Sequence, residues 1–522
     1  MIDDDVSFPL RVAAVDMGSN AIRFLVAEFA NEVQHAALVS ERVPVRLGHG
    51  VYLSGRLDQA AMDAAVATLE RFRRQMAELG VEHYRAVATS AVRESKNGDE
   101  FVERVRTATG IDLEPISGSE ETRLVHLAVA NRLPLGRRRW LLVDLGGGSV
   151  EVSLVDHGGT IWSESHTMGS VRLLEVLTEA GADPGRFRRL LEEYVSVLRV
   201  PAAVGAGRIA GYIATGGNIE TLARLAGARP DPDVSRLPVE RLRTVIEQLA
   251  AMSYRERVME LGLREDRADV VLPAAFVYLR LAELCRAQEI IVPNVGVREG
   301  VVLDLVDGLA RSHGHADRQT REVLAGAVTV GRKYHVDEAH ARHVEGLALA
   351  LFDQLRPLHN LAGADRKILQ AAALLHNIGQ FVSFKGHHKH SFYLISNTEL
   401  PNFSQHEMRL VATVARYHRG ADPTPHHHPF AELPEADQQR VLRLVALLRL
   451  AVALDRDHLQ RVRNLQVRIG SSSVTLHLEA SGGLLLEGWS LEKKSQLFAE
   501  VFSRKIRLRF AGDEVDGHAE ES

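Results

Sequence analysis

The sequence predicts an α/β protein with two similar lobes around a shared cleft, followed by a mostly helical part. The lobes are predicted from a repeat, because the segments 12–27 and 141–155 each contain an apolar strand, an aspartate, a turn with glycine and serine, and a second strand. The two aspartates, Asp16 and Asp144, lie 144 − 16 = 128 residues apart, which is roughly the length of a domain. From His335 onward the chain holds 16 of its 24 histidines, mostly within helical patterns, which predicts a separate C-terminal part.

The glycine turns of this repeat suit a phosphate group. Glycine lets successive backbone N–H groups converge on an anion without a side chain in the way. Asp144 ends one apolar strand and Glu151 begins the next, so the two carboxylates could hold a divalent metal ion or its bound water. The turn is not a P-loop, because no Lys-Ser or Lys-Thr follows the glycines, and a following strand excludes the dinucleotide fingerprint. One such hairpin is as consistent with a plain turn as with a ligand loop, and the second copy favours the ligand loop.

Composition limits the possible classes. With 522 residues, 45% of them hydrophobic and 25% charged, the chain has the composition of a globular protein of three or four domains. A net charge of −5 argues against a general nucleic-acid binder. The single cysteine, Cys285, excludes an internal disulfide and suits a reducing compartment. The acidic start at residues 1–5 and the lack of a long apolar run predict neither a signal peptide nor a membrane span, and we expect a cytoplasmic protein without a membrane partner.

The first lobe is expected to continue with a helix at 59–79, where apolar residues recur at helical spacing. A strand at 84–88 then leads into a polar turn. Ser119 could cap a further helix whose first turn holds Glu120 and Glu121, where the helix dipole favours negative charge. Capping explains one of the two glutamates and leaves the other open to a second role.

The second lobe is expected to follow the same plan. After the hairpin at 141–155, the segment 211–220 predicts another strand, a glycine turn and the start of a helix. A helical run at 270–285 and a last strand at 290–294 close the lobe.

In the C-terminal part, the segment 371–379 looks like the His-Asp helix of metal-dependent HD phosphohydrolases. The rest of that pattern is also present, carried by His343, His390, His418 and Asp455. The defining aspartate is replaced by Asn377, and a neutral amide is a poor bridge between hard divalent cations. The histidine runs 387–390 and 426–428 could still take up a transition metal. We favour a scaffold in which Lys385, Lys389 and histidines help to hold a long anionic chain.

Taken together, these motifs resemble the actin-like phosphotransferase superfamily, and within it the exopolyphosphatase and guanosine pentaphosphate phosphatase family in its long form. The motifs that carry the resemblance are the two aspartate hairpins, Thr89–Arg93, Gly118–Glu121, Met168–Arg172 and Gly216–Gly217. The resemblance implies two actin-like, ribonuclease H-like lobes around a cleft, then a helical HD-like domain and a small C-terminal α/β unit. We place these parts at residues 1–130, 131–308, 316–460 and 461–510, with a disordered tail at 511–522.

The resemblance implies a hydrolase that releases the terminal phosphate of inorganic polyphosphate by metal-assisted attack of water. A guanosine pentaphosphate 5′-phosphohydrolase that yields guanosine tetraphosphate is the alternative, because both substrates present the same terminal anhydride. An actin-like ATPase or kinase and a non-catalytic polyphosphate sensor are alternatives of other classes. The family also implies a homodimer.

The resemblance assigns roles to particular residues. It implies that Glu121 positions the attacking water, with Glu120 as the second choice, and that Arg93 neutralises developing charge. Mg²⁺ or another divalent cation would lie near Asp16, Asp144 and Glu151. The implied phosphate-binding residues are Gly18, Ser19, Asn20, Gly146, Gly147, Gly148, Ser149, Thr215, Gly216 and Gly217.

Overall fold

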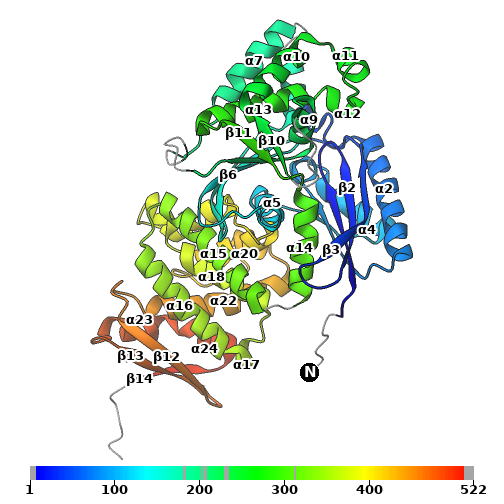
Figure 1. The fold of residues 1–522 in the computed structure, drawn as a ribbon. Helices are drawn as coiled ribbons and strands as arrows, with labels where there is room; N and C mark the ends of the chain where they lie inside the picture. The colour runs from blue at the N-terminus through cyan, green and yellow to red at the C-terminus, as the bar shows by residue number, and fades with distance from the viewer. Residues whose placement is uncertain are drawn as a thin grey trace, which may run out of the picture. The chain divides into compact units, whose positions relative to one another are not determined.

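The computed structural model describes residues 7–179, 184–201, 204, 209–227, 234–310 and 313–510. The chain divides into two compact units, Met1–Arg318 and Gln319–Ser522 (Figure 1). The tail predicted to be disordered, 511–522, lies outside the described residues. No helix in the described ranges is both long enough and apolar enough to span a membrane.

The first lobe is built on a five-stranded sheet with the order β3-β2-β1-β4-β5. Its strands are β1 (Leu10–Met17), β2 (Ile22–Phe29), β3 (His35–Val43), β4 (His83–Ala88) and β5 (Leu113–Pro115). The pairs β1–β2 and β2–β3 are antiparallel, whereas β1–β4 and β4–β5 are parallel. A hairpin therefore lies on one side of β1 and parallel crossovers lie on the other.

The second lobe repeats this arrangement. Its six-stranded sheet has the order β10-β11-β9-β6-β7-β8. The strands are β6 (Trp140–Leu145), β7 (Val150–Asp156), β8 (Gly159–His166), β9 (Tyr212–Thr215), β10 (Ser235–Pro238) and β11 (Glu289–Val292). From the β8 edge, the series β8-β7-β6-β9-β11 matches β3-β2-β1-β4-β5 in order and in strand direction. The two sheets thus confirm the predicted pair of similar α/β lobes, with β1 and β6 in equivalent places.

Helices cover both faces of each sheet in this unit. They are α1 (Val51–Ser54), α2 (Gln59–Glu78), α3 (Ser90–Arg93), α4 (Gly98–Thr109), α5 (Gly118–Arg132), α6 (Ser170–Glu179), α7 (Pro184–Ser196), α9 (Gly217–Leu225), α10 (Val239–Ala251), α11 (Tyr254–Met259), α12 (Glu265–Ala268), α13 (Val271–Cys285) and α14 (Val297–Leu309). Alternate residues of β1 point to opposite faces. Val15 and Met17 therefore pack with Leu69 and Phe72 of α2, which is the helix that the sequence predicts at 59–79.

The opposite face of β1 packs on a layer formed by α5 and α14. Val12 of β1 and Leu142 of β6 belong to the same apolar core as Leu124 of α5 and Val301 of α14, so this layer is shared by the two sheets. Figure 1 shows α14 beside the strands of the first sheet. A Cβ atom at Gly300 would overlap the carbonyl oxygen of Leu124, so glycine is needed where α14 crosses α5.

The remaining elements are mostly helical, as predicted. They are α15 (His313–Lys333), α16 (Glu338–Gln354), α17 (Arg356–His359), α18 (Gly363–Leu375), η1 (Ile378–Phe381), α19 (His387–Ser396), α20 (Gln405–Arg416), α21 (His428–Ala431), α22 (Glu435–Ala453), β12 (Val462–Ile469), β13 (Ser473–Ala480), α23 (Leu485–Lys494), α24 (Gln496–Phe502) and β14 (Lys505–Phe510). The three strands form a sheet of order β12-β13-β14, which shares one apolar core with α16, α18, α20 and α22.

Candidate active site

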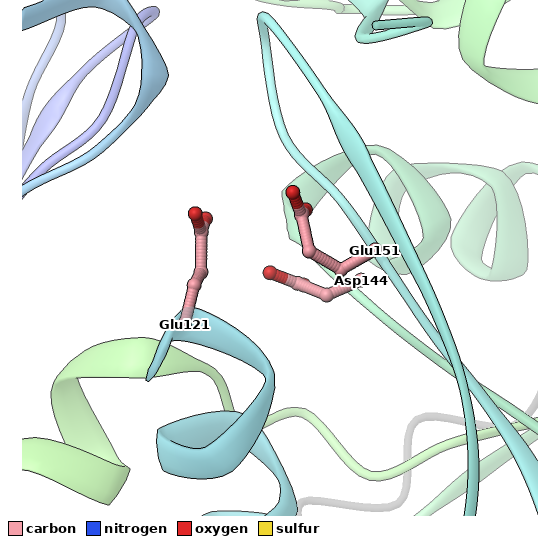
Figure 2. Close-up of side chains that lie close together, drawn as sticks. All are labelled: Glu121, Asp144 and Glu151. Carbon is pink, nitrogen blue, oxygen red and sulfur yellow. The ribbon is translucent and has the colours of Figure 1, made fainter. Parts of the chain in front are cut away.

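Three buried carboxylates from three elements meet between the two lobes. Glu121 lies in the first turn of α5, Asp144 lies near the end of β6, and Glu151 lies near the start of β7. The β6–β7 register places Asp144 directly opposite Glu151, so both side chains leave the sheet on the same face. One oxygen of each of the three carboxylates lies within 4.8 Å of the others. Figure 2 shows Asp144 and Glu151 on their neighbouring strands, facing Glu121 at the end of its helix.

The three carboxylates destabilise one another's charge. Burial, and then the charges of Glu151 and Asp144, raise the pKa of Glu121 well above its usual value. Burial and Asp144 raise the pKa of Glu151 to about 7. Burial also raises the pKa of Asp144, although the Thr215 hydroxyl donates a hydrogen bond of 2.6 Å to its Oδ1. The site therefore concentrates negative charge that its own surroundings compensate only in part.

The neighbouring glutamates Glu120 and Glu121 lie in different surroundings. Glu120 accepts hydrogen bonds from Arg123 and Arg85, and both arginines also bind Asp304 of α14. Burial alone would raise the pKa of Glu120, but these two arginines outweigh burial and lower it. Glu120 is thus part of an ion-pair network between α5, β4 and α14. Glu121 instead points into the carboxylate cluster.

Two arginines close to the cleft carboxylates differ in what they contact. Arg23 of β2 donates a 2.9 Å hydrogen bond to Asp16, which lines the cleft but is not one of the three clustered carboxylates. Arg93, which the sequence predicts as a site residue, donates a 2.6 Å hydrogen bond to the carbonyl of Ile116, and its Nη1 lies 3.9 Å from Oε2 of Glu121. Arg93 therefore contacts the predicted water-positioning carboxylate and does not line the cleft itself.

The carboxylates lie beside a cleft of about 290 Å³ between the lobes. Ten of the residues predicted from the sequence line it, namely Asp16, Gly18, Ser19, Asn20, Glu121, Asp144, Gly146, Gly147, Gly216 and Gly217. Six others do not, namely Arg93, Glu120, Gly148, Ser149, Glu151 and Thr215. Of these six, Glu151 belongs to the carboxylate cluster and Thr215 hydrogen-bonds to Asp144. The structure therefore brings both aspartate hairpins and the β9–α9 turn to one cavity.

Gly148 lies where the two lobes touch. A Cβ atom at this position would overlap the hydroxyl of Tyr52 and the hydroxyl of Ser90, both from the first lobe. The hydroxyls of Ser19 and Tyr52 are 2.7 Å apart and hydrogen-bonded. Glycine is required here because the hairpin of one lobe packs directly on side chains of the other.

Five arginines on the cleft were not predicted from the sequence. They are Arg23, Arg42, Arg264, Arg267 and Arg298. Burial, and then the neighbouring Arg42 and Arg23, lower the pKa of Arg267 to about 9. Among the described residues, Nε and Nη1 of Arg42 and Nε of Arg267 are buried and have no hydrogen-bond acceptor. These donors suit an anionic ligand, since guanidinium groups bind phosphate oxygens in pairs.

The carboxylate cluster fits a hard divalent cation. All of its donors are oxygens, which are the ligands that Mg²⁺ and Ca²⁺ prefer. Oε2 of Glu121 and Oε2 of Glu151 are buried, and neither accepts a hydrogen bond within the described part of the chain. A cation bound at Asp144 and Glu151 would satisfy Oε2 of Glu151 and offset the repulsion that raises the three pKa values, and Oε2 of Glu121 would stay available to a water molecule.

Comparison with family models identifies the chain. A model described as the Ppx/GppA phosphatase family matches residues 25–309. The chain belongs to this family. A second model, described as Ppx/GppA phosphatase, domain III, matches residues 324–496. The predicted family is therefore confirmed, and with it the prediction of a phosphatase.

Individual members of the Ppx/GppA family resemble most of the chain. A protein named guanosine-5′-triphosphate,3′-diphosphate pyrophosphatase from Photobacterium profundum is 27% identical over 472 residues, which are 86% of this chain and 88% of that protein. A protein of the same name from Aeromonas salmonicida is 26% identical over 506 residues, 94% and 96% of the two chains. The crystal structure of an exopolyphosphatase from Cytophaga hutchinsonii is 29% identical with a TM-score of 0.54, and covers 57% of this chain and 98% of that one. These similarities confirm the predicted two-lobed fold with a helical C-terminal part.

In the part of the chain that matches domain III, the histidines that contact Asp455 and His418 are not the ones that the sequence pattern named. His340, not the predicted His343, hydrogen-bonds to Asp455, and His387, not the predicted His390, contacts His418. The two alternatives lie three residues apart on α16 and on α19 and therefore share a helix face, so the sequence pattern could not separate them.

Proposed function

We propose that this phosphatase releases the terminal phosphate of inorganic polyphosphate. The observation that supports the proposal is the cluster of Glu121, Asp144 and Glu151 beside a cleft lined with arginines. Hydrolysis of a phosphoanhydride needs a carboxylate to orient the water, cations to balance the phosphoryl oxygens, and donors that hold the chain in line. The cleft offers each of these from a different element.

Each set of residues then has its own task. Glu121 orients the attacking water and accepts its proton, a role that a raised carboxylate pKa favours. Arg93, whose Nη1 lies 3.9 Å from Glu121, holds that carboxylate and balances developing charge. The N–H groups of the turns 18–20 and 146–149, with those of Gly216 and Gly217, bind the terminal phosphate. The cleft arginines bind the phosphates behind it.

Asp16, Asp144 and Glu151 would hold Mg²⁺ or another divalent cation. When bound, such a cation would supply positive charge that offsets the negative charge developing on the phosphoryl oxygens during transfer. This assignment is supported by the clustering of Asp144 and Glu151 with Glu121, and by Asp16, which lines the same cleft and is ion-paired with Arg23.

The lining of the cleft favours polyphosphate over a nucleotide. Among its described residues there is no aromatic side chain on which a base could stack, and the apolar ones are Ala21, Leu145, Val295 and Val297. Guanosine pentaphosphate is the second candidate, because two relatives that align over at least 86% of this chain are named guanosine-5′-triphosphate,3′-diphosphate pyrophosphatases. The predicted homodimer, the HD-like character of domain III and the cytoplasmic location stay predictions.

The test is phosphate release by the purified chain with Mg²⁺, with long-chain polyphosphate, guanosine pentaphosphate and ATP offered in parallel. We expect polyphosphate to give the highest kcat/KM. Glu121→Gln should lower kcat by about 10²- to 10⁴-fold while the melting temperature and polyphosphate binding are retained. A folded Glu121→Gln variant with wild-type turnover would contradict the role of Glu121. Preference for the pentaphosphate would select the second candidate, and turnover of ATP alone would indicate an ATPase.

A further inference from the structure

Two hydroxyl groups hold the carboxylates that the second lobe contributes to the cluster. The hydroxyl of Thr215 on β9 donates a 2.6 Å hydrogen bond to Oδ1 of Asp144. The hydroxyl of Ser165 on β8 donates a 3.0 Å hydrogen bond to Oε1 of Glu151. An ionised carboxylate can only accept hydrogen bonds, so the hydroxyls are the donors. Neither Thr215 nor Ser165 lines the cleft, so neither is placed to bind a phosphate there.

The strand register brings each hydroxyl to its carboxylate. Asp144 is paired with Thr215 in the β6–β9 ladder. Glu151 is paired with Ser165 in the β7–β8 ladder and with Asp144 in the β6–β7 ladder. Residues paired across neighbouring strands point to the same face of a sheet. The four side chains therefore form one row across β9, β6, β7 and β8, with a hydroxyl at each end and the carboxylates in the middle.

Thr215 is held so that its hydroxyl keeps this direction. The side chain is 2% exposed and branched at Cβ, which restricts its rotation. The buried hydroxyl of Tyr278 on α13 donates a 2.7 Å hydrogen bond to the backbone carbonyl of Thr215. The second acceptor near the Thr215 hydroxyl is the carbonyl of Val143 at 3.4 Å, which is farther away than Oδ1 of Asp144. The hydrogen bond to Asp144 is therefore the one that fixes this donor.

Each carboxylate keeps one oxygen for a cation. Oδ1 of Asp144 and Oε1 of Glu151 accept the hydroxyl protons. Oε2 of Glu151 is buried and accepts no hydrogen bond from the described residues. An oxygen that already accepts a hydrogen bond is a weaker metal ligand, so each carboxylate offers its other oxygen. Mg²⁺ takes single oxygens at about 2.0 to 2.1 Å in an octahedron, whereas Ca²⁺ also accepts both oxygens of one carboxylate at about 2.3 to 2.6 Å.

We propose that Thr215 and Ser165 are positioning residues that present each carboxylate to a divalent cation through one oxygen, and that they thereby favour Mg²⁺ over Ca²⁺. The inference rests on the metal site of the proposed function. It gives Thr215 a different task from the phosphate binding that the family resemblance implies. Thr215 has the larger effect, because Ser165 is exposed on the edge strand β8, where water can replace its hydroxyl. Ser149 is also a further hydrogen-bond donor to Glu151.

The test is Mn²⁺ binding to the full-length protein without substrate, after metals are removed with EDTA and the EDTA is dialysed away. Free Mn²⁺ is measured by electron paramagnetic resonance, with Mg²⁺ and Ca²⁺ as competitors. In the wild type, Mg²⁺ should displace Mn²⁺ at a lower concentration than Ca²⁺ does. Thr215→Val keeps the shape, removes the hydroxyl and should weaken Mn²⁺ binding by about 10- to 100-fold. It should also raise the affinity for Ca²⁺ relative to Mg²⁺ by at least about threefold, because Asp144 can then use both oxygens.

Three further variants complete the experiment. Thr215→Ser keeps the hydroxyl and should bind Mn²⁺ within about threefold of the wild type. Thr221→Val removes a hydroxyl of another cleft residue, which donates to the carbonyl of Gly217, and it should bind Mn²⁺ as the wild type does. Ser165→Ala should raise the affinity for Ca²⁺ relative to Mg²⁺ by about twofold. Circular dichroism of each metal-free variant shows whether it folds.

The outcomes separate the positioning role from the proposed function. Absence of Mn²⁺ binding in the wild type, or full binding by Glu151→Gln, would overturn the metal site and this inference with it. Loss of binding in Glu151→Gln, with wild-type affinity and selectivity in Thr215→Val, would overturn the positioning role alone. An unchanged Mn²⁺ affinity of Thr215→Val with a raised KM for polyphosphate at saturating Mg²⁺ would instead make Thr215 a phosphate ligand. If Thr215→Val does not fold, Ser165→Ala decides, and an unchanged ratio of Ca²⁺ to Mg²⁺ affinity would refute the proposal.

Discussion

Replacement of Glu151 by glutamine is expected to stabilise the metal-free protein while it inactivates the enzyme. Burial and Asp144 place the pKa of Glu151 at about 7, against 4.5 for an ordinary glutamate. A difference of about 2.5 pKa units corresponds to roughly 3 kcal/mol of unfolding free energy. Because the pKa is raised in the folded state, the wild type loses this free energy as the pH rises from about 4.5 to about 7. Glutamine has the same shape, can still accept the hydrogen bond from Ser165, and carries no charge.

The assay is unfolding by urea in EDTA at about pH 5 and about pH 8. At the higher pH, the free energy of unfolding of Glu151→Gln should exceed that of the wild type by up to about 3 kcal/mol. At the lower pH, the two free energies should nearly agree. Mg²⁺ should reverse the order, because only the wild type gains the free energy of metal binding. A metal-free variant that is less stable than the wild type at about pH 8, or a difference that does not change with pH, would refute this explanation.

Three further predictions follow from the same unit. Glu120→Gln should act in the opposite direction and lower the free energy of unfolding by about 3 to 5 kcal/mol at neutral pH, because Arg85 and Arg123 lose a buried partner. Urea unfolding should show that this difference from the wild type shrinks in acid. Gly148→Ala should lower kcat/KM, because the added methyl group pushes the lobes apart at Tyr52. A second change, Tyr52→Ala, should restore part of the lost kcat/KM, and a Gly148→Ala protein with wild-type kcat/KM would contradict the contact. Arg267→Met should raise KM for polyphosphate by about ten- to a hundredfold. It should not lower the melting temperature of the free protein, because the removed cation is buried and no carboxylate among the described residues is bonded to it.

The hairpins could be predicted because their signals are local. The order of strand, aspartate, glycine turn and strand lies within a few consecutive residues, and periodicity alone places Asp16 and Asp144 at the ends of β1 and β6. The repeat of that order then predicts two lobes. The topology agrees, since the two sheets share strand order and direction around β1 and β6.

The choice between Glu120 and Glu121 could not be predicted from local pattern. Both lie in the first turn of α5, and consecutive helical residues point in different directions. Their surroundings come mostly from far along the chain, because Arg85 donates a hydrogen bond to Glu120 and is itself held by Asp304, while Asp144 and Glu151 face Glu121. Arg123, three residues after Glu120 on the same helix, is the one local trace of the first set of partners, and the sequence contains none of the second.

The cleft arginines were missed for the same reason. Arg42 lies on β3 and Arg267 on α12, and each is a single charge without a surrounding motif. Lone arginines are more often solvated than buried, so only the fold can show that these two converge. The one available signal was the density of arginines near residue 264, which alone favours a surface helix.

The position of α14 determines when the first lobe can finish folding. This helix is encoded after the whole second lobe, yet its Val301 and Val302 complete the core behind Val12 and Val87 of the first sheet. During synthesis the strands of the first lobe leave the ribosome early and α14 leaves it last, so one apolar face of the first sheet stays exposed until α14 is made. A fragment that ends after β11 should therefore aggregate. A chain in which 1–132 is joined to 297–309 by a flexible linker should keep that face covered, which makes the first lobe a single structural body assembled from two separate stretches of the gene.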